Sequence, residues 1–151
     1  MFSKATEYAL RATIFIARKS DEDKKLSLDE VAKGINSPRS FTAKILQKLT
    51  TDNRIVNSTR GPNGGFFMTG KAKDLPARAI LEVMEEDQVL EKCVLGLKQC
   101  SEARPCPMHS EYKLIKARLK TLFENTAIRH LADELDKGEG RSGTRKIILS
   151  K

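Results

Sequence analysis

The stretch spanning residues 27–69 constrains the fold of this chain most, because cap and turn signals divide it into four short segments. The S-x-x-E pattern at residues 27–30 predicts a helix N-terminus, and Gly34 is placed to close that helix. Ser37, followed by Pro38, predicts the N-cap of a second helix. Two short helices joined by a tight turn predict a helix-turn-helix.

A β-hairpin is predicted directly after the second helix. The runs RIVNST (54–59) and FFMT (66–69) are β-prone, and the glycine-rich turn RGPNGG joins them. Residues 33–60 also contain six Lys and Arg but one Asp, so they supply a net charge of +5 (six minus one) out of +8 for the chain. Charge concentrated on a winged helix indicates phosphate binding, although a basic surface kept for solubility would give the same net charge.

The outward face of the second helix and the hairpin are therefore expected to contact double-stranded DNA. A recognition helix needs small or polar residues facing the major groove, and a guanidinium at a hairpin tip suits the minor groove. The glycines of the turn would allow positive φ and close approach to the sugar-phosphate chain. A structural hairpin that binds a partner protein is the alternative. The predicted DNA-contact residues are Ser37, Arg39, Ser40, Lys44, Gln47, Lys48, Arg60, Gly61, Gly64 and Gly65.

All three cysteines of the chain and one histidine fall in a single loop, with the spacing Cys-x6-Cys-x5-Cys-x2-His. These residues are Cys93, Cys100, Cys106 and His109. Three thiolates and an imidazole can hold an iron–sulfur cluster or a zinc ion. The wide gaps favour the cluster modestly, because zinc loops usually contain short Cys-x2–4-Cys pairs. Small apolar packing without metal, and a thiol enzyme using Cys106 and His109, are further alternatives. No third orienting residue supports catalysis, so we expect no enzyme.

A long helix is predicted to follow the cysteine loop from Pro107. Apolar residues recur in it at intervals of 4, 3, 4 and 3, which predicts an apolar seam over two heptads, suited to packing on a partner helix. The predicted dimer-interface residues are Met108, Tyr112, Ile115, Leu119 and Leu122.

The remaining segments predict a mainly α fold with a small β-hairpin: a winged helix-turn-helix domain plus a long C-terminal dimerisation helix. Buried helices are expected at residues 4–19 and from Pro76 to about Glu86, and a last helix after Thr126. We predict a DNA-binding domain at 1–75, a cluster-binding loop with dimerisation helices at 76–136, and a flexible basic tail at 137–151. Arg11 interrupts the first apolar run and no membrane span is visible, so a cytoplasmic location without a membrane partner is expected.

Four features carry a resemblance to a known family: EYALRA at 7–12, SFTAKILQKL at 40–49, RGPNGGF at 60–66, and the three-cysteine loop before a long helix. Over about residues 1–136 the chain resembles the Rrf-two family of bacterial winged-helix transcription regulators, and its IscR/NsrR-like members in particular. The resemblance implies a cytoplasmic homodimer that binds a palindromic operator, often as a repressor. It also implies sensing of redox state, nitric oxide or iron–sulfur status through a cluster.

The resemblance also implies a ligand set. Cys93, Cys100 and Cys106 match the family's three cluster cysteines, and His109 matches the histidine ligand of IscR-like members, which hold a 2Fe–2S cluster in preference to 4Fe–4S. Nitric-oxide-sensing members take an N-terminal carboxylate instead, for which Glu7 is the nearest candidate, although a solvated residue is the simpler interpretation. Two departures from the IscR pattern matter. The first gap between cysteines is six residues, against five in IscR, which leaves the cluster type open. The entry to the recognition helix, INSPRSF, is longer than in IscR, which leaves the operator sequence open. A zinc-stabilised or metal-free winged-helix protein is the alternative function.

Overall fold

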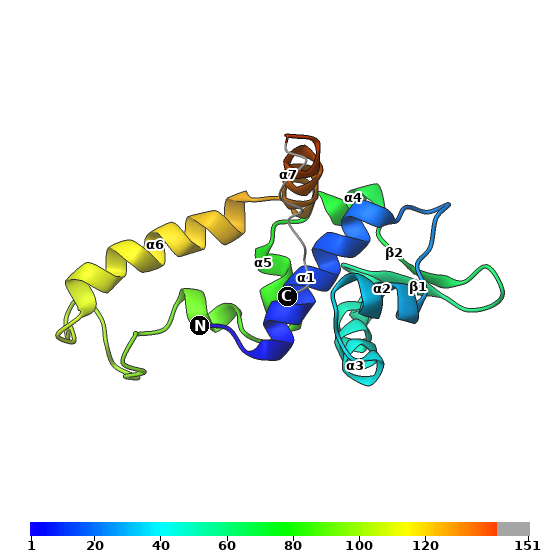
Figure 1. Cartoon of the computed structure of the whole chain (residues 1–151). Helices are drawn as coiled ribbons and strands as arrows, with labels where there is room; N and C mark the ends of the chain where they lie inside the picture. The colour runs from blue at the N-terminus through cyan, green and yellow to red at the C-terminus, as the bar shows by residue number, and fades with distance from the viewer. Residues whose placement is uncertain (142–151) are drawn as a thin grey trace.

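The computed structural model describes residues 1–141, with side chains described through residue 137. It is mainly helical with one two-stranded antiparallel sheet, as predicted from the sequence (Figure 1). The helices are α1 (Lys4–Lys19), α2 (Leu28–Gly34), α3 (Arg39–Leu49), α4 (Gly70–Lys73), α5 (Arg78–Val83), α6 (His109–Asn125) and α7 (Ile128–Arg141). The strands are β1 (Asn57–Thr59) and β2 (Gly65–Phe67), and two short 3-10 turns are η1 (Thr51–Asn53) and η2 (Asp87–Leu90).

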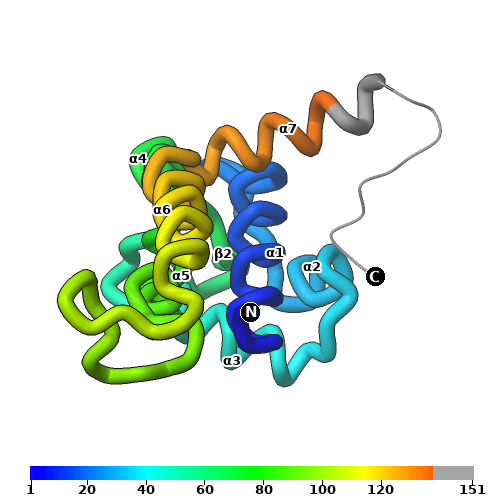
Figure 2. The backbone as a smooth tube through the Cα atoms, turned by 90° about the vertical axis from the view of Figure 1, so that its left-hand side faces the viewer, coloured from blue at the N-terminus to red at the C-terminus, as the bar shows by residue number. Residues whose placement is uncertain are grey.

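Helix α1 lies at the centre of the molecule, with α2 and α3 on one side and α7 on another (Figures 1 and 2). Its buried face combines alanines with Ile16, so neighbouring helices can approach its backbone closely. Two hydroxyl side chains form hydrogen bonds within or next to the helix. The Thr13 hydroxyl donates to the Ala9 carbonyl at 2.8 Å, and Ser3, the N-cap residue, accepts from the Thr6 N–H at 3.2 Å. The predicted buried helix at residues 4–19 is confirmed.

One hydrophobic core joins the winged helix to the elements that follow it. Ile16 and Leu46, from the N-terminal helices, share this core with Ile80 of α5 and Ile128 of α7. Backbone hydrogen bonds fix the same junction, because the Ile128 N–H donates to the Leu75 carbonyl at 2.9 Å. The core is therefore continuous across residue 75, and the part that stands apart from it is the cysteine loop with α6 (Figure 1).

Helix α2 begins with the predicted capping box. The Ser27 hydroxyl accepts from the Glu30 N–H at 3.1 Å, and the Glu30 carboxylate accepts from the Ser27 N–H at 3.3 Å. The helix ends at Gly34, but the left-handed residue of the turn is Asn36, with φ of 50°. Gly34 is needed for packing instead, because a Cβ there would lie 2.2 Å from the Phe15 ring.

Helix α3 begins one residue later than the sequence predicted. Its N-cap residue is Pro38, and no side chain caps its first turn. The prediction that Ser37 is the N-cap was therefore wrong: its hydroxyl is buried and has no hydrogen-bond partner among the residues that the structure describes. The rigid Pro38 takes its place, because proline fixes a backbone φ compatible with helix entry. The apolar face holds as predicted, with Ile45, Leu46 and Leu49 buried.

The hairpin is present, with shorter strands than predicted. Asn57 pairs with Phe67 and Thr59 with Gly65. Leu26, which precedes α2, pairs with the other edge of β2: its N–H donates to the Phe66 carbonyl at 2.8 Å and its carbonyl accepts from the Phe66 N–H at 2.7 Å. The base of the wing is thus tied to the entrance of the helix-turn-helix.

The C-terminal elements differ from prediction in their lengths. Helix α5 begins at Arg78, two residues after Pro76, and ends at Val83 rather than near Glu86. Helix α7 continues to Arg141, so the last helix extends into the segment that was predicted to begin a tail at Lys137. The rest of the predicted tail, 142–151, lies outside the described residues. Within residues 1–141, every helix is too short or too polar to cross a bilayer.

Candidate functional site

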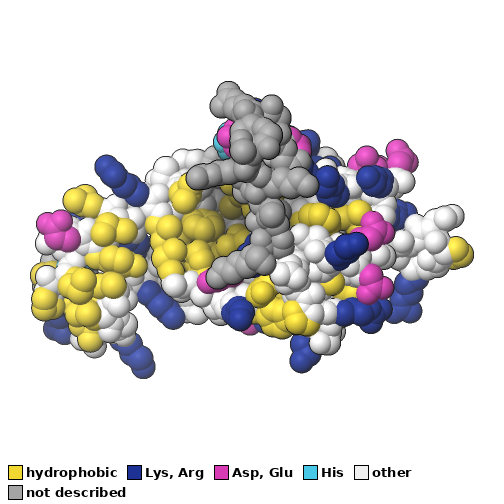
Figure 3. Space-filling model, in the orientation of Figure 1, with side chains coloured by type: hydrophobic (Ala, Val, Ile, Leu, Met, Phe, Trp, Pro, Cys, Tyr) yellow, Lys and Arg dark blue, Asp and Glu magenta, His cyan; other side chains and the backbone are white. Residues whose placement is uncertain are grey.

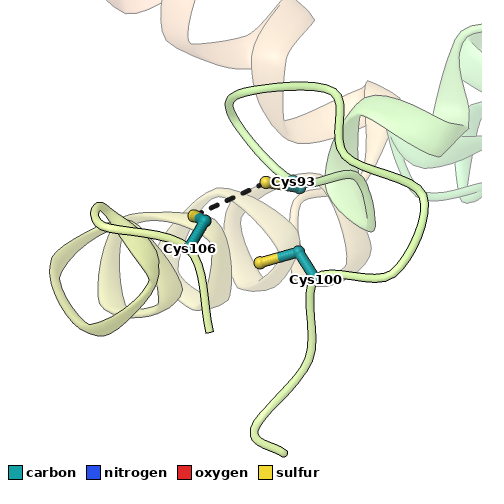
Figure 4. Close-up of side chains that lie close together, drawn as sticks. All are labelled: Cys93, Cys100 and Cys106. Atoms are coloured by element: carbon teal, nitrogen blue, oxygen red, sulfur yellow. Dashed lines mark hydrogen bonds between the residues drawn. The ribbon is translucent and has the colours of Figure 1, made fainter. Parts of the chain in front are cut away.

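The three cysteines converge in the loop between η2 and α6. Their sulfur atoms lie within 4.8 Å of one another and point toward a common centre (Figure 4). Cys93 Sγ lies 3.6 Å from Cys106 Sγ, and all three thiols are half-buried and free of disulfides. Because residues thirteen positions apart meet here, it is the fold of the loop that brings the three thiols together. The predicted convergence of Cys93, Cys100 and Cys106 is confirmed.

His109 adjoins the thiols as the first residue of α6. Its Nδ1 lies 3.4 Å from Cys100 Sγ, but among the described residues the group of ligand atoms within 4.8 Å of one another consists of the three cysteines without His109. Its Nε2 lies 3.6 Å from a carboxylate oxygen of Glu102, which also contacts the Lys113 ammonium. Together with side chains of α6, the thiols and the imidazole line one pocket.

The site favours ionisation of Cys93 over that of Cys100. The backbone N–H of Leu97 is the main cause that lowers the pKa of Cys93, to about 7, and the neighbouring thiols of Cys100 and Cys106 add to it. At Cys100 a backbone hydrogen bond from Cys106 favours the thiolate, but burial and the adjacent thiols outweigh it and raise the pKa. The loop therefore presents a soft donor set with a thiolate available near neutral pH.

The entrance of the cysteine loop and the far end of α6 are fastened to the body by ion pairs. Arg78 of α5 lies 3.8 Å from the Glu91 carboxylate, at the loop entrance, and contacts Glu124 near the end of α6. On α6, Lys120 pairs with Glu91 at 2.7 Å, and Lys116 donates to the Glu91 carbonyl at 3.1 Å. Glu91 thus ties the start of the loop both to α5 and to α6.

Helix α6 presents apolar side chains that nothing in the described chain covers. No residue of this helix is buried among the described residues, and apolar side chains gather at the surface at the α6 and loop end of the molecule (Figure 3). Of the predicted interface residues, three are exposed, namely Met108 (48%), Ile115 (60%) and Leu122 (56%). Tyr112 and Leu119 are half-buried. Large exposed apolar side chains in one stripe mark an interaction surface.

The predicted DNA-contact residues of α3 lie on its exposed face. Ser40, Lys44, Gln47 and Lys48 are exposed and Arg39 is at the first helical position. The Arg39 guanidinium is 2.8 Å from the Asp29 carboxylate, a contact between two exposed side chains that the sequence did not suggest. Ser37 stands apart from this set, since its hydroxyl is buried.

The hairpin carries the other predicted contacts. Arg60 and Gly61 are exposed at its tip, and Gly61 adopts a φ of 104°. Gly64 and Gly65 are half-buried and meet the protein's own backbone: a Cβ at Gly64 would lie 2.3 Å from the Thr59 carbonyl, and one at Gly65 would lie 2.6 Å from that of Leu26. The close approach that these two glycines permit is therefore internal.

Three residues beside the thiols were not predicted from the sequence. Glu102 sits in the loop, seven positions before His109, and no local spacing rule connects the two. Lys113 and Lys116 line the thiol pocket because α6 turns these positions inward. A helical wheel begun at His109 would have indicated Lys113 and Lys116, at positions i+4 and i+7.

A basic helix-turn-helix with a wing, a helix that projects from the body and a thiol site between them define a class, the winged-helix DNA-binding transcriptional regulators. Residues 2–134 match the family model described as "Iron-dependent Transcriptional regulator" (Rrf2). The chain belongs to the Rrf2 family.

Individual relatives agree with this class. A protein of Aquifex aeolicus with a provisional name as an HTH-type transcriptional regulator is 30% identical over 139 residues, covering 91% of this chain and 94% of its own. The HTH-type transcriptional regulator NsrR of Oceanobacillus iheyensis is 30% identical over 125 residues, covering 82% and 84%. The structure of CymR, the global cysteine regulator of B. subtilis, superposes with a TM-score of 0.71 at 23% identity, covering 89% and 97%, which shows the shared fold.

Proposed function

We propose that this transcriptional regulator acts as a homodimer whose binding to a palindromic operator depends on an iron–sulfur cluster held by Cys93, Cys100, Cys106 and His109. A 2Fe–2S cluster fits this ligand set in preference to 4Fe–4S. The observation that carries the proposal is the convergence of three sulfur atoms within 4.8 Å of one another. Disturbance of the cluster by oxidants, nitric oxide or iron shortage would be the signal.

The donor set of the loop fits such a group. Thiolates are the usual ligands of iron–sulfur clusters, and imidazole replaces thiolate in some of them. Cys93, with a pKa of about 7, supplies a thiolate at small cost. Lys113 and Lys116 place positive charge beside the thiols, which offsets the negative charge that accumulates on ligation. When bound, the cluster supplies a redox-active, oxidant-labile centre.

Recognition of DNA is assigned to α3 and the wing. In this proposal Arg39, Ser40, Lys44, Gln47 and Lys48 face the major groove, and Arg60 reaches the adjacent minor groove. Asp29 holds the Nε side of Arg39, which leaves the terminal nitrogens of the guanidinium free for a guanine edge or a phosphate. Gly61 lets the wing tip approach the backbone closely.

Coupling between the two sites follows from the path of the chain. Ligation by Cys93 and Cys106 would lock together the segments that follow η2 and precede α6, and thereby set the direction in which α6 projects. In a dimer built on α6, that direction fixes the distance between the two recognition helices. Half-sites on DNA lie about 34–36 Å apart, or at multiples of this spacing, so a change in helix direction alters operator affinity.

The proposal is tested on full-length protein purified without exposure to oxygen. Iron and sulfide analysis, an absorbance spectrum and sedimentation should report a coloured dimer with acid-labile sulfide. Cysteine-to-serine changes at 93, 100 or 106 should abolish the colour, while the exposed Ser101→Ala control keeps it. Colourless protein with stoichiometric zinc would overturn the sensing function in favour of a zinc-stabilised regulator, the alternative that the same Cys3His donors allow.

A further inference from the structure

The two ring nitrogens of His109 face two different groups. Nδ1 lies 3.4 Å from Cys100 Sγ, on the side of the three thiols. Nε2 is buried and has no hydrogen-bond partner among the described residues, although a carboxylate oxygen of Glu102 lies 3.6 Å away. That distance is longer than a hydrogen bond, yet a small rotation of the exposed Glu102 side chain would close it. A buried N–H without an acceptor is costly, so Glu102 is the group that this nitrogen needs.

The Glu102 carboxylate is held where it can accept this proton. Lys113, one turn after His109 on α6, contacts the same carboxylate oxygen that faces Nε2. Since α6 carries both His109 and Lys113 at positions i and i+4, the helix places the two side chains on the same face. Glu102 thus bridges the loop to the helix at the point where the ring must be oriented.

We propose that Glu102 is a positioning residue that orients His109 for metal ligation through Nδ1, by accepting a hydrogen bond from Nε2–H. The inference rests on the proposed function, since it concerns the fourth ligand of the same centre. A neutral imidazole carries one N–H, so an acceptor at Nε2 leaves the lone pair at Nδ1, on the thiol side. Ligating histidines commonly donate their second N–H to a carboxylate, which fixes the tautomer and makes the ring a stronger donor.

The ligating atom can be read with zinc as a diamagnetic probe that accepts three thiolates and an imidazole. Long-range proton–nitrogen NMR of the zinc-loaded full chain distinguishes Nδ1 from Nε2, because the ring Hδ2 proton correlates strongly with Nε2. The chain has two histidines, and His130, exposed on α7, serves as an unligated reference. We expect zinc on Nδ1 of His109 and a proton on Nε2. Zinc on Nε2 would overturn the inference while the cluster proposal stands. Zinc bound by the cysteines without His109 would overturn the inference and also remove His109 from the proposed ligand set.

The role of Glu102 is tested with Glu102→Gln, Glu102→Asp and the control Glu111→Gln. Glu111 is exposed in the first turn of α6, so its variant removes the same charge nearby. Loss of a carboxylate partner typically weakens metal binding about 10–100-fold, which we expect for zinc in Glu102→Gln, with partial recovery in Glu102→Asp. In the iron–sulfur form, Glu102→Gln should shift the reduction equilibrium toward the reduced state about tenfold, about 59 mV for one electron.

Equal zinc affinity and equal reduction potential in wild type and Glu102→Gln would refute the positioning role. A Glu111→Gln variant that matches Glu102→Gln would also refute it, because the effect would then be one of net charge alone. Protein that binds neither zinc nor a cluster would overturn the proposed function and this inference together.

Discussion

Gly34 ends α2 where the Phe15 ring lies against the backbone, and its lack of a side chain makes that contact possible. Arg60 is placed at the exposed tip of the wing. At the thiol site, the imidazole of His109 meets Cys100. At the residue scale, the fold therefore depends on a small residue in the core and the function on a few exposed or half-buried polar ones.

Gly34→Ala is expected to destabilise the fold by about 1–2 kcal/mol, because the new Cβ would lie 2.2 Å from the Phe15 ring and the ring must move. Alanine's better helix propensity offsets part of this cost, by at most about 1 kcal/mol. Denaturant unfolding of Gly34→Ala, Phe15→Leu and the double variant measures the effect. The account requires Gly34→Ala to cost less in the Phe15→Leu background, and strict additivity would contradict it.

Arg60→Ala should weaken duplex binding by about 1–3 kcal/mol, most at sites flanked by A·T-rich sequence, if its guanidinium enters the minor groove. The control is Lys137→Ala on α7, which lies on the opposite side of the body from α3 (Figure 1). Fluorescence anisotropy against a duplex selected from a randomised pool provides the measurement. Equal losses of duplex affinity in both variants would show that only net charge matters and that the wing does not contact DNA.

At the scale of elements, α6 stands out because its sequence carries apolar side chains that its surroundings leave exposed. Its apolar residues recur with a seam spacing, yet no residue of the helix is buried among the described residues. The body holds it through polar contacts, Lys116 and Lys120 with Glu91, and through an edge-to-face contact between Phe2 and Phe123, whose centroids lie 5.5 Å apart. The apolar stripe remains available for a second subunit.

Leu122→Glu should shift the protein from dimer to monomer, because a carboxylate would be buried in the seam. The matched control is Thr121→Glu, which places the same charge on an exposed position roughly opposite the seam. Sedimentation velocity over a range of concentrations distinguishes the two. A Leu122→Glu variant that sediments as the wild-type dimer would place the interface elsewhere.

Arg78→Ala should loosen the junction between the cysteine loop and the body. Its guanidinium, 21% exposed, lies within 4 Å of carboxylates on Glu82, Asp87 and Glu91 and also contacts Glu124. Amide hydrogen exchange should rise in residues 87–125 and remain unchanged in the helix-turn-helix. The control Arg129→Ala removes a comparable pair, with Asp74 at 2.7 Å, outside this junction. Unchanged exchange after Arg78→Ala would show that the loop is held without these pairs.

At the scale of the whole molecule, the sequence predicted what local signals encode. The capping box at Ser27 and Glu30, the hairpin turn and the seam in α6 depend on neighbours within a few residues, and the structure reproduces the first two directly. The convergence of Cys93, Cys100 and Cys106 was predicted from ligand chemistry rather than from spacing alone. The family resemblance supplied the dimer and the operator, which remain proposals.

Local sequence patterns could not predict contacts between segments that are distant in the chain. Ser37 looked like an N-cap because nothing local indicated that the fold would bury its hydroxyl. The ion pair of Arg39 with Asp29 joins two helices, and the core contacts of Ile128 join the two ends of the chain. Glu102 reaches His109 only because the loop folds back on α6. Each case depends on tertiary packing, which no window of sequence contains.

The dependence of operator binding on the cluster is tested by measuring the affinity of the dimer with and without it. A duplex selected from a randomised pool by the cluster-containing protein is titrated, at one salt concentration, with that protein and with the same protein after chelation of its iron. Fixed salt is necessary because phosphate contacts alone make affinity depend strongly on ionic strength. The account predicts at least about a fivefold difference in affinity, the lower end of a typical coupling between sites. Equal affinities for every selected duplex would show that the thiol loop and the reading helices act independently.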